Sequence, residues 1–169
     1  MDEQGRHVGA GTEGELRVRG PQAFKGYVDG SLDAAAFDEE GFVRTGDLGV
    51  LGPAGHVRIT GRIKDIIIRN AENISALEME NVLYEHPKIA DVAVVGVPDP
   101  VTGERACAVV ALASGVTVLT LDELVEFCRA RKVANQKIPE RLEIVEQLPR
   151  NALGKIQKRE LRAQLSGRP

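Results

Sequence analysis

The sequence predicts an α+β fold in two unequal parts: a β-rich first part, and a second part in which strands and helices alternate. Before residue 61 the apolar residues are few and alternate with polar ones, as in strands that are buried on one face. After it, apolar runs such as VAVVGV and ACAVVALA lie between segments whose apolar residues have helical spacing. Hydrophobic residues make up 43% of the chain and charged residues 28%, which is typical of a globular protein and excludes a disordered one.

The first part is predicted to contain short strands and one short helix. Strands are expected at residues 14–20, 22–27, 42–51 and 56–60. The helix is expected at residues 31–37 with Ser31 as its N-cap, and Gly52-Pro53-Ala54-Gly55 is a turn signal between the last two strands. These segments contain too few apolar residues to bury much of a core without a neighbour.

The second part contains the stronger signals. Strands are expected at residues 66–68, 92–97, 106–113 and 142–145, and helices after Ser75, after Thr120 and at residues 158–165. Ser75 with Glu78, and Thr120 with Glu123, have the spacing of a capping box, which marks the first turn of a helix. This part is therefore expected to fold as a unit of its own.

Charge and cysteine usage exclude several classes of protein. The net charge of −3 gives no general attraction to nucleic acid. Residues 147–169 carry 6 Lys and Arg against 1 Glu, which suits either a phosphate-bearing small molecule or a solvated last helix. Cys107 and Cys128 have neither disulfide nor zinc spacing and are expected to be buried thiols of an intracellular protein. No apolar stretch approaches the roughly 18–20 residues of a membrane span, so no integral membrane segment is expected.

Residues 44–48, RTGDL, place an acid directly after a glycine inside an extended run. A carboxylate accepts two hydrogen bonds side by side, so Asp47 could hold the two hydroxyls of a ribose. The same residues are also ordinary β-turn chemistry, and from this segment alone both interpretations stay open.

Residues 61–65, GRIKD, put two cations and an acid at the junction of the two parts. The Arg62 guanidinium can bind phosphate through two N–H groups, and Lys64 and Asp65 could exchange partners if the two parts rotate. A solvated linker is the alternative. Asn70-Ala71 follows at a corner where a positive φ is plausible, which Asn tolerates and Ala does not readily adopt.

Residues 148–155, LPRNALGK, form a loop that presents Lys155 beside a glycine. It is not a Walker loop, because Pro149 stands where the first glycine would be and Ile156 replaces Ser or Thr. A lysine in this position could bridge a carboxylate and a phosphate, although an ordinary surface lysine is the alternative.

In their order and spacing these segments resemble the C-terminal third of the adenylate-forming enzymes, which include acyl- and aryl-CoA synthetases, luciferases and the adenylation domains of peptide synthetases. The resemblance runs from about residue 11 to residue 165 and rests on GELRVRGPQAFKGY, RTGDL, GRIKDIIIRNAENISALEME and LPRNALGKIQKREL. It implies that residues 1–62 are the β-rich edge of a large N-terminal adenylation domain that is otherwise missing. Residues 63–66 would be a hinge, and residues 67–169 a small α+β lid domain with a mixed sheet flanked by helices.

The resemblance also implies roles for single residues. Asp47 would hold the ribose of ATP, and Arg62 would contact ribose or phosphate. Lys64 and Asp65 would form the hinge about which the lid rotates between two half-reactions. Lys155 would be the catalytic residue, stabilising charge and contacting the nucleotide as a carboxylate attacks the α-phosphate.

After this rotation a different surface would face the thiol acceptor. The residues implied on the CoA side are Ile68, Asn70, Ala71 and Asn73. The family usually has Gly where Ala71 stands, so this position departs from the pattern. An alanine there would change the geometry of the tunnel through which the thiol acceptor is expected to reach the acyl-AMP.

The implied activity is that of an AMP-forming acid–CoA ligase, with a fatty acid as the expected carboxylic acid and ATP and CoA as co-substrates. The ligands of Mg²⁺ and the phosphate loop would belong to the missing domain, so no metal site is expected in this chain and the chain alone is expected to be inactive. Lysine at position 64 favours CoA ligases, since peptide-synthetase domains tend to carry Asp there. A cytoplasmic enzyme of fatty-acid metabolism is the resulting expectation.

Two alternatives remain open. The acyl-AMP could be delivered to a carrier protein or another acceptor such as oxygen. The chain could instead be a free-standing, lid-like binding module that has lost catalysis.

Overall fold

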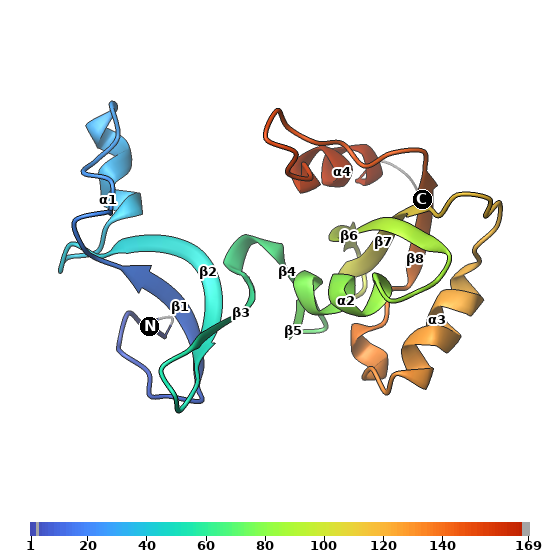
Figure 1. The fold of residues 1–169 in the computed structure, drawn as a ribbon, viewed down its shortest axis with the longest axis horizontal. Coiled ribbons are helices and arrows are strands. Elements are labelled where there is room, and N and C mark those ends of the chain that lie inside the picture. Colours follow the sequence, from blue (N-terminus) through green and yellow to red (C-terminus); the bar gives the residue numbers. More distant parts are fainter. Residues whose placement is uncertain (3, 167–169) are drawn as a thin grey trace. The chain divides into compact units, whose positions relative to one another are not determined.

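The computed structural model describes residues 1–2 and 4–166 of the chain. The chain divides into two compact units, residues 1–64 and residues 65–169, and each unit is built on one β-sheet of its own (Figure 1). The sheet of the first unit is antiparallel, and that of the second is mixed. The predicted α+β class with a mixed sheet flanked by helices is thus confirmed.

The first unit is a three-stranded sheet whose strands follow sequence order. The strands are β1 (Glu13–Val18), β2 (Val43–Leu51) and β3 (Val57–Arg62). A 3-10 turn, η1 (Gly30–Leu32), and a single turn of helix, α1 (Asp33–Ala36), lie between β1 and β2. Three of the four strands expected in this part are therefore confirmed.

Two expectations for the first unit are wrong. Residues 22–27 form no strand, because the N–H of Tyr27 donates to Asp33 Oδ1 at 2.8 Å instead of to a neighbouring strand. Ser31 is not the N-cap of the short helical segment. Asp29 takes that place, and its Oδ1 accepts hydrogen bonds from the N–H of Ser31 at 3.0 Å and from Ser31 Oγ at 2.7 Å. The Asp29 carboxylate therefore caps the turn, and the Ser31 hydroxyl donates to it instead of acting as a cap itself.

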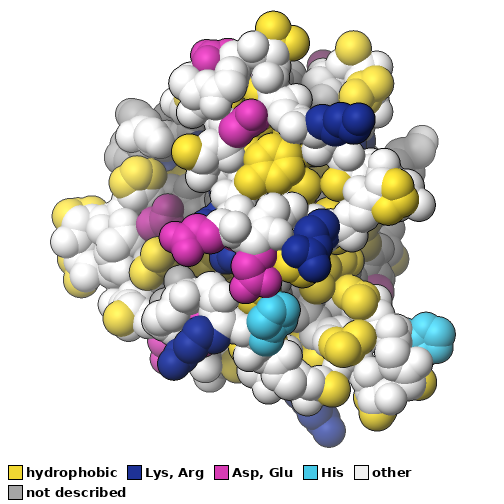
Figure 2. Space-filling model, turned by 90° about the vertical axis from the view of Figure 1, so that its left-hand side faces the viewer, with side chains coloured by type: hydrophobic (Ala, Val, Ile, Leu, Met, Phe, Trp, Pro, Cys, Tyr) yellow, Lys and Arg dark blue, Asp and Glu magenta, His cyan; other side chains and the backbone are white. Residues whose placement is uncertain are grey.

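Charged side chains occupy the middle of the first unit. Arg17 donates to Glu15 at 2.8 Å and to Asp38 at 2.9 Å, and none of these three side chains is more than 11% exposed. Among the described residues, every buried hydrophobic side chain lies after residue 65. Figure 2 shows hydrophobic side chains reaching the surface at many points. The described residues of the first unit therefore form no buried apolar core of their own, in agreement with the composition of this part.

The second unit is a five-stranded sheet whose central strand is β7. Its strands are β4 (Ile66–Arg69), β5 (Glu72–Ser75), β6 (Ile89–Asp99), β7 (Gly103–Leu112) and β8 (Arg141–Val145). β6 pairs antiparallel with β7 along nearly its whole length. The other edge of β7 is shared: antiparallel β4 pairs at its start and parallel β8 towards its end, while β5 pairs with β4.

Helices cover both faces of this sheet (Figure 1). α2 (Ala76–Leu83) and α3 (Leu121–Ala130) pack on one face, and α4 (Lys158–Leu165) packs on the other. Successive side chains of a strand point to opposite faces, so Val92 and Val94 join the first core while Ala93 and Val95 join the second. A strand buried on both faces must be apolar throughout, which explains the run VAVVGV.

Two helices of the second unit, α2 and α3, begin where their capping residues predict. Ser75 Oγ accepts a hydrogen bond from the N–H of Glu78 at 3.3 Å. Thr120 Oγ1 accepts from the N–H of Glu123 at 3.2 Å, and the Glu123 carboxylate accepts from the N–H of Thr120 at 3.5 Å, which completes a capping box. A short 3-10 turn, η3 (Asn135–Lys137), separates α3 from β8.

The β4–β5 hairpin contains a strand that the sequence does not reveal. Arg69 pairs with Glu72, so Asn70 and Ala71 form a two-residue turn. Both turn residues have positive φ, 50° for Asn70 and 62° for Ala71, as in the type I′ turns that suit the twist of a hairpin. Asn adopts this conformation readily, whereas the Cβ of Ala71 makes it unfavourable by about 1 kcal/mol.

Replacing Ala71 with Gly is expected to raise the free energy of unfolding by about 0.5–1 kcal/mol, because glycine adopts a positive φ without a Cβ clash. Urea denaturation followed by circular dichroism measures the change. The matched control is Ala163→Gly on an exposed position of α4, which should lower the free energy of unfolding by about 1 kcal/mol, since glycine weakens a helix interior. Destabilisation by both changes would mean that the backbone at Ala71 is not strained.

Candidate active site

Asp47 and Arg62 face each other across two neighbouring strands of the first unit. They are register partners in β2 and β3, and Arg62 Nε donates to Asp47 Oδ1 at 2.5 Å. The Asp47 side chain is 34% exposed and that of Arg62 46%, so solvent reaches both. The two residues expected to bind the nucleotide are thus brought together. One offers carboxylate oxygens to hydroxyl donors, and the other offers N–H groups to phosphate.

A kink in β2 determines where the Asp47 carboxylate lies. Thr45 Oγ1 donates to the carbonyl of Leu16 in β1 at 2.6 Å and accepts from the N–H of Asp47 at 3.0 Å. Gly46 between them has a φ of +70°, which glycine adopts without strain. The turn-like chemistry of this segment and a binding role for Asp47 are therefore compatible, because the kink fixes the backbone that carries the carboxylate.

Lys64 and Asp65 lie in a 3-10 turn, η2 (Ile63–Asp65), where the first compact unit ends and the second begins. Lys64 is exposed and Asp65 is half-buried. Asp65 pairs with two cations of α4, Arg162 at 2.8 Å and Lys158 at 3.8 Å. Asp65 is thereby attached to the second unit, and the role of residues 63–66 as a hinge stays a prediction.

A carboxylate of α2 extends this ion pairing into the interior. Glu80 Oε1 accepts hydrogen bonds from the N–H of Val94 at 2.7 Å and from Lys158 Nζ at 2.7 Å. Through the first of these bonds Glu80 satisfies a backbone donor on the edge of β6 that faces away from β7. Burial raises the pKa of the Glu80 carboxyl above its usual value, although the positive charge of Lys158 opposes the shift.

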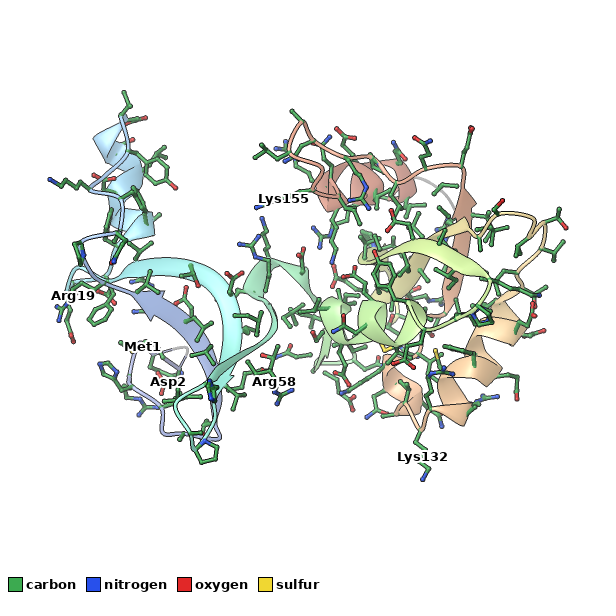
Figure 3. The ribbon with its side chains drawn as sticks, viewed as in Figure 1. Met1, Asp2, Arg19, Arg58, Lys132 and Lys155 are labelled. Atoms are coloured by element: carbon green, nitrogen blue, oxygen red, sulfur yellow. The ribbon has the colours of Figure 1, made fainter. Side chains whose placement is uncertain are left out.

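Lys155 lies at the end of a tight loop between β8 and α4 (Figure 3). Arg150 and Ile156 form an isolated bridge at the base of the loop, and Asn151 Oδ1 accepts from the N–H of Lys155 at 2.9 Å. Leu148 and Ile156 pack into the core beneath α4 and hold the loop from both sides. The ammonium group of Lys155 is thus presented on an exposed loop with a defined backbone.

The residues predicted to face the thiol acceptor lie together on the β4–β5 hairpin. Ile68 and Asn73 are register partners on its exposed face, and Asn70 and Ala71 form its turn. The opposite face of the hairpin is buried in the core beneath α2 and α3. The loop of Lys155 is anchored in the core on the other side of the sheet. The hairpin is thus anchored through one core of the unit and the loop of Lys155 through the other.

Glu104 of β7 is a further residue of this region that sequence reasoning misses. Its Oε2 accepts the N–H of Ile68 at 2.8 Å, which ties the hairpin to the central strand. The carboxylate lies over Gly96, where a Cβ would stand only 2.8 Å from it. The glycine inside the apolar run VAVVGV was the available signal, since such a glycine often marks a close approach by another group.

Comparisons with known proteins agree with these features. Residues 78–155 match the family of the AMP-binding enzyme C-terminal domain. The chain is 46% identical, over 99% of its length, to the medium-chain fatty-acid–CoA ligase of Escherichia coli (strain K12). It is 40% identical, over 96% of its length, to the vibriobactin-specific 2,3-dihydroxybenzoate-AMP ligase of Vibrio cholerae. The chain spans 30% of the length of each of these curated relatives.

The likeness extends to solved structures. The crystal structure of ATP-bound MatB from Rhodopseudomonas palustris aligns with a TM-score of 0.90 at 34% sequence identity. The alignment covers 98% of this chain and 33% of that one. Both the fold and the sequence therefore correspond to about one-third of these enzymes.

Two features are absent from residues 1–2 and 4–166. No helix in this part is both long enough and apolar enough to cross a membrane. No three His, Cys, Asp or Glu side chains in this part come together as metal ligands do.

The Glu80–Lys158 pair generates a prediction about stability. Lys158→Met leaves the Glu80 carboxylate buried without its cation and should lower the free energy of unfolding at pH 7 by about 3 kcal/mol. The loss should shrink as the pH falls towards 5. When the pKa of a carboxyl is higher in the folded chain than in the unfolded chain, the folded chain takes up the proton at a higher pH. Lowering the pH between these two pKa values therefore favours the folded chain.

Urea denaturation at pH 7 and at pH 5 measures this effect relative to the unchanged chain at each pH. Arg159→Met, which removes an exposed cation from the next position of α4, is the matched control and should cost at most about 0.5 kcal/mol. Adding Glu80→Gln to Lys158→Met should recover part of the loss at pH 7. An equal loss at both pH values would show that the Glu80 charge is not its cause.

Proposed function

We propose a function from one premise: the chain belongs to the adenylate-forming enzymes, and residues 78–155 to their C-terminal domain family. The chain would be the C-terminal part of an AMP-forming acid–CoA ligase, a cytoplasmic enzyme of fatty-acid metabolism. Its second unit would act as the lid that supplies Lys155 and the surface facing CoA. The 46% identity to a medium-chain fatty-acid–CoA ligase supports a fatty acid as the substrate.

The observation that carries this proposal is the presentation of Lys155. Its backbone is held by Asn151 and its loop is anchored in the core by Leu148 and Ile156, while the side chain is exposed. A cation that projects into solvent from a fixed backbone is suited to bind negative charge on another part of the enzyme. Electrostatic groups that are held in place before the reaction are effective because they need no reorganisation during it.

In the first half-reaction the substrate carboxylate would attack the α-phosphorus of ATP. An oxygen–phosphorus bond forms, the bond between the α-phosphorus and the bridging oxygen breaks, and pyrophosphate leaves with that electron pair. Lys155 would stabilise the negative charge that develops on the carboxylate and phosphate oxygens. Asp47 would accept hydrogen bonds from the ribose hydroxyls, and Arg62 would contact ribose or phosphate once released from Asp47.

In the second half-reaction the thiolate of CoA would attack the acyl carbonyl carbon, and AMP would leave. The exposed face of the β4–β5 hairpin, with Ile68, Asn73 and the Asn70-Ala71 turn, would then line the path of the thiol. A rotation about the hinge at Lys64 and Asp65 would withdraw the loop of Lys155 and bring the exposed face of the hairpin to the reaction centre. Mg²⁺ would neutralise phosphate charge, and its ligands are proposed to lie in the part of the enzyme outside this chain.

A second candidate keeps the first half-reaction and changes the acceptor. It is favoured by the 40% identity to a 2,3-dihydroxybenzoate-AMP ligase, which is nearly as high as the identity to the fatty-acid–CoA ligase. In this case the acid would be aromatic, and the acyl-AMP would pass to a carrier protein or another acceptor. A non-catalytic binding module is a third possibility that the exposed, hydrogen-bonded loop of Lys155 disfavours.

The first experiment measures AMP release by the full-length protein that contains this chain, with ATP, Mg²⁺ and a panel of fatty and aromatic acids. Fatty acids are expected to drive AMP release only when CoA is present. Pyrophosphate exchange that depends on an aromatic acid, with no effect of CoA, would favour the second candidate. Neither activity with any acid would overturn the enzyme proposal.

Lys155→Ala in the same protein is expected to lower acid-dependent pyrophosphate exchange by at least about 100-fold, because a fixed charge next to the developing oxyanion is lost. Thioester formation from supplied acyl-AMP and CoA should be nearly unchanged. The matched control is Lys132→Ala, which removes an exposed lysine at the end of α3 (Figure 3). Equal losses in both half-reactions would contradict the role of Lys155.

A further inference from the structure

We propose that Asp91 and Arg150 are positioning residues for Lys155. Arg150 joins the carbonyl of Gly154, the residue directly before Lys155, to the Asp91 carboxylate on β6. The inference rests on the proposed role of Lys155 and adds the means by which the loop is held in one orientation on the domain. We call Asp91, Arg150 and the Gly154 carbonyl the loop clamp.

The loop clamp runs through a single planar side chain. Arg150 Nη1 donates to the Gly154 carbonyl oxygen at 2.5 Å, and Nη2 donates to Asp91 Oδ2 at 2.5 Å. A guanidinium holds its N–H groups in a fixed geometry, so one rigid group sets the distance between the carboxylate and the carbonyl. Asp91 is 59 residues from Arg150 in the sequence, and the clamp is therefore a tertiary contact.

The Asp91 end of the clamp is itself fixed. Asp91 Oδ1 accepts from Tyr84 Oη at 2.7 Å and from the N–H of Val92 at 3.1 Å, which leaves Oδ2 for Arg150. Burial alone would disfavour the charged carboxylate, but the hydrogen bonds from Tyr84 and Arg150 outweigh it and hold the pKa of Asp91 below its usual range. Asp91 is therefore ionised at neutral pH, and its two carboxylate oxygens are held in place by hydrogen bonds from Tyr84 and Arg150.

The shape and the orientation of the loop have separate causes. Asn151 Oδ1 accepts the N–H groups of Leu153 at 3.0 Å and Lys155 at 2.9 Å, which fixes the shape of the turn. All residues from 151 to 155 are exposed, so apolar packing does not hold the tip of the loop. Among the contacts of the described residues, Arg150 provides the link from Gly154 to the sheet.

The energetics separate a positioning role from a stabilising one. The Arg150 side chain is 44% exposed and that of Asp91 is 22% exposed. Ion pairs at such a surface add only about 0–1 kcal/mol to stability. A displacement of a reacting group by about 1 Å, in contrast, can lower a rate by about 100-fold. Loss of the clamp is therefore expected to change the rate far more than the stability.

The test uses Arg150→Met in the full-length protein and measures both half-reactions. Acid-dependent pyrophosphate exchange should fall by about 10- to 100-fold, mainly in kcat and with little change in the KM for ATP. Thioester formation from supplied acyl-AMP should be nearly unchanged, because Lys155 is not used in that step. Arg150→Lys, which can reach only one of the two acceptors, should fall between Arg150→Met and the unchanged protein.

A double variant distinguishes positioning from a general effect on folding. In the Lys155→Ala background, Arg150→Met should lower pyrophosphate exchange no further, because the group that it positions is already gone. Arg131→Met is the matched control. It removes another surface ion pair of the same unit, to Glu85 at 2.8 Å, and should leave both half-reactions unchanged.

Three results would overturn the inference. Unchanged pyrophosphate exchange in Arg150→Met, equal losses in both half-reactions, or a full further loss in the Lys155→Ala background would each show that Arg150 does not act through Lys155. If Lys155→Ala itself kept full pyrophosphate exchange, the proposed role of Lys155 would fail and this inference with it, while the enzyme proposal would stand. Dependence on Lys155 without dependence on Arg150 would overturn the inference alone.

Discussion

The β6–β7 ladder is buried on both faces, and the rest of the second unit depends on it. An apolar sheet of this kind must have its edges covered, because unpaired backbone groups attract other strands. β8 and β4 share the outer edge of β7, and Glu80 accepts a backbone donor on the outer edge of β6. The positive charge of Lys158 offsets part of the cost of burying Glu80 there. The same carboxylate thus accepts the backbone donor at the edge of β6 and pairs with Lys158.

Two exposed parts of the candidate site in the second unit are attached to this ladder by polar side chains. Asp91 of β6 holds the loop of Lys155, and Glu104 of β7 holds the β4–β5 hairpin through the N–H of Ile68. Asp65, at the start of the unit, is paired with α4, the helix that comes after the same loop. Each attachment joins an exposed segment to a rigid element. Exposed residues can thus have defined positions without burying apolar surface of their own.

The sequence predicts the features that depend on local periodicity and caps, and misses those that depend on tertiary contacts. The bounds of α4 and the starts of α2 and α3 agree with their patterns, since apolar spacing and capping side chains act within one turn. β5 is missed because Asn70-Ala71 lacks the Asn-Gly signal of a type I′ turn. Asp91 and Arg150 are missed because an ion pair between residues 59 apart has no sequence period. Residue chemistry offers Asp47, Arg62 and Lys155 as candidates, the family resemblance favours them, and their roles stay predictions.

The proposed reaction requires Lys155 to be fixed in one half-reaction and removed in the other. The polar attachments reconcile these demands, because they tie the loop of Lys155 to its own domain, with which the loop can move as one body. On the other side of the junction Arg62 is paired with Asp47 in the first unit, while Asp65 is paired with α4 in the second. Ile63 and Lys64 lie exposed between these two ion pairs. We infer that a rotation of the lid would be taken up by the backbone of these two residues, so that Lys155 is moved with its clamp intact.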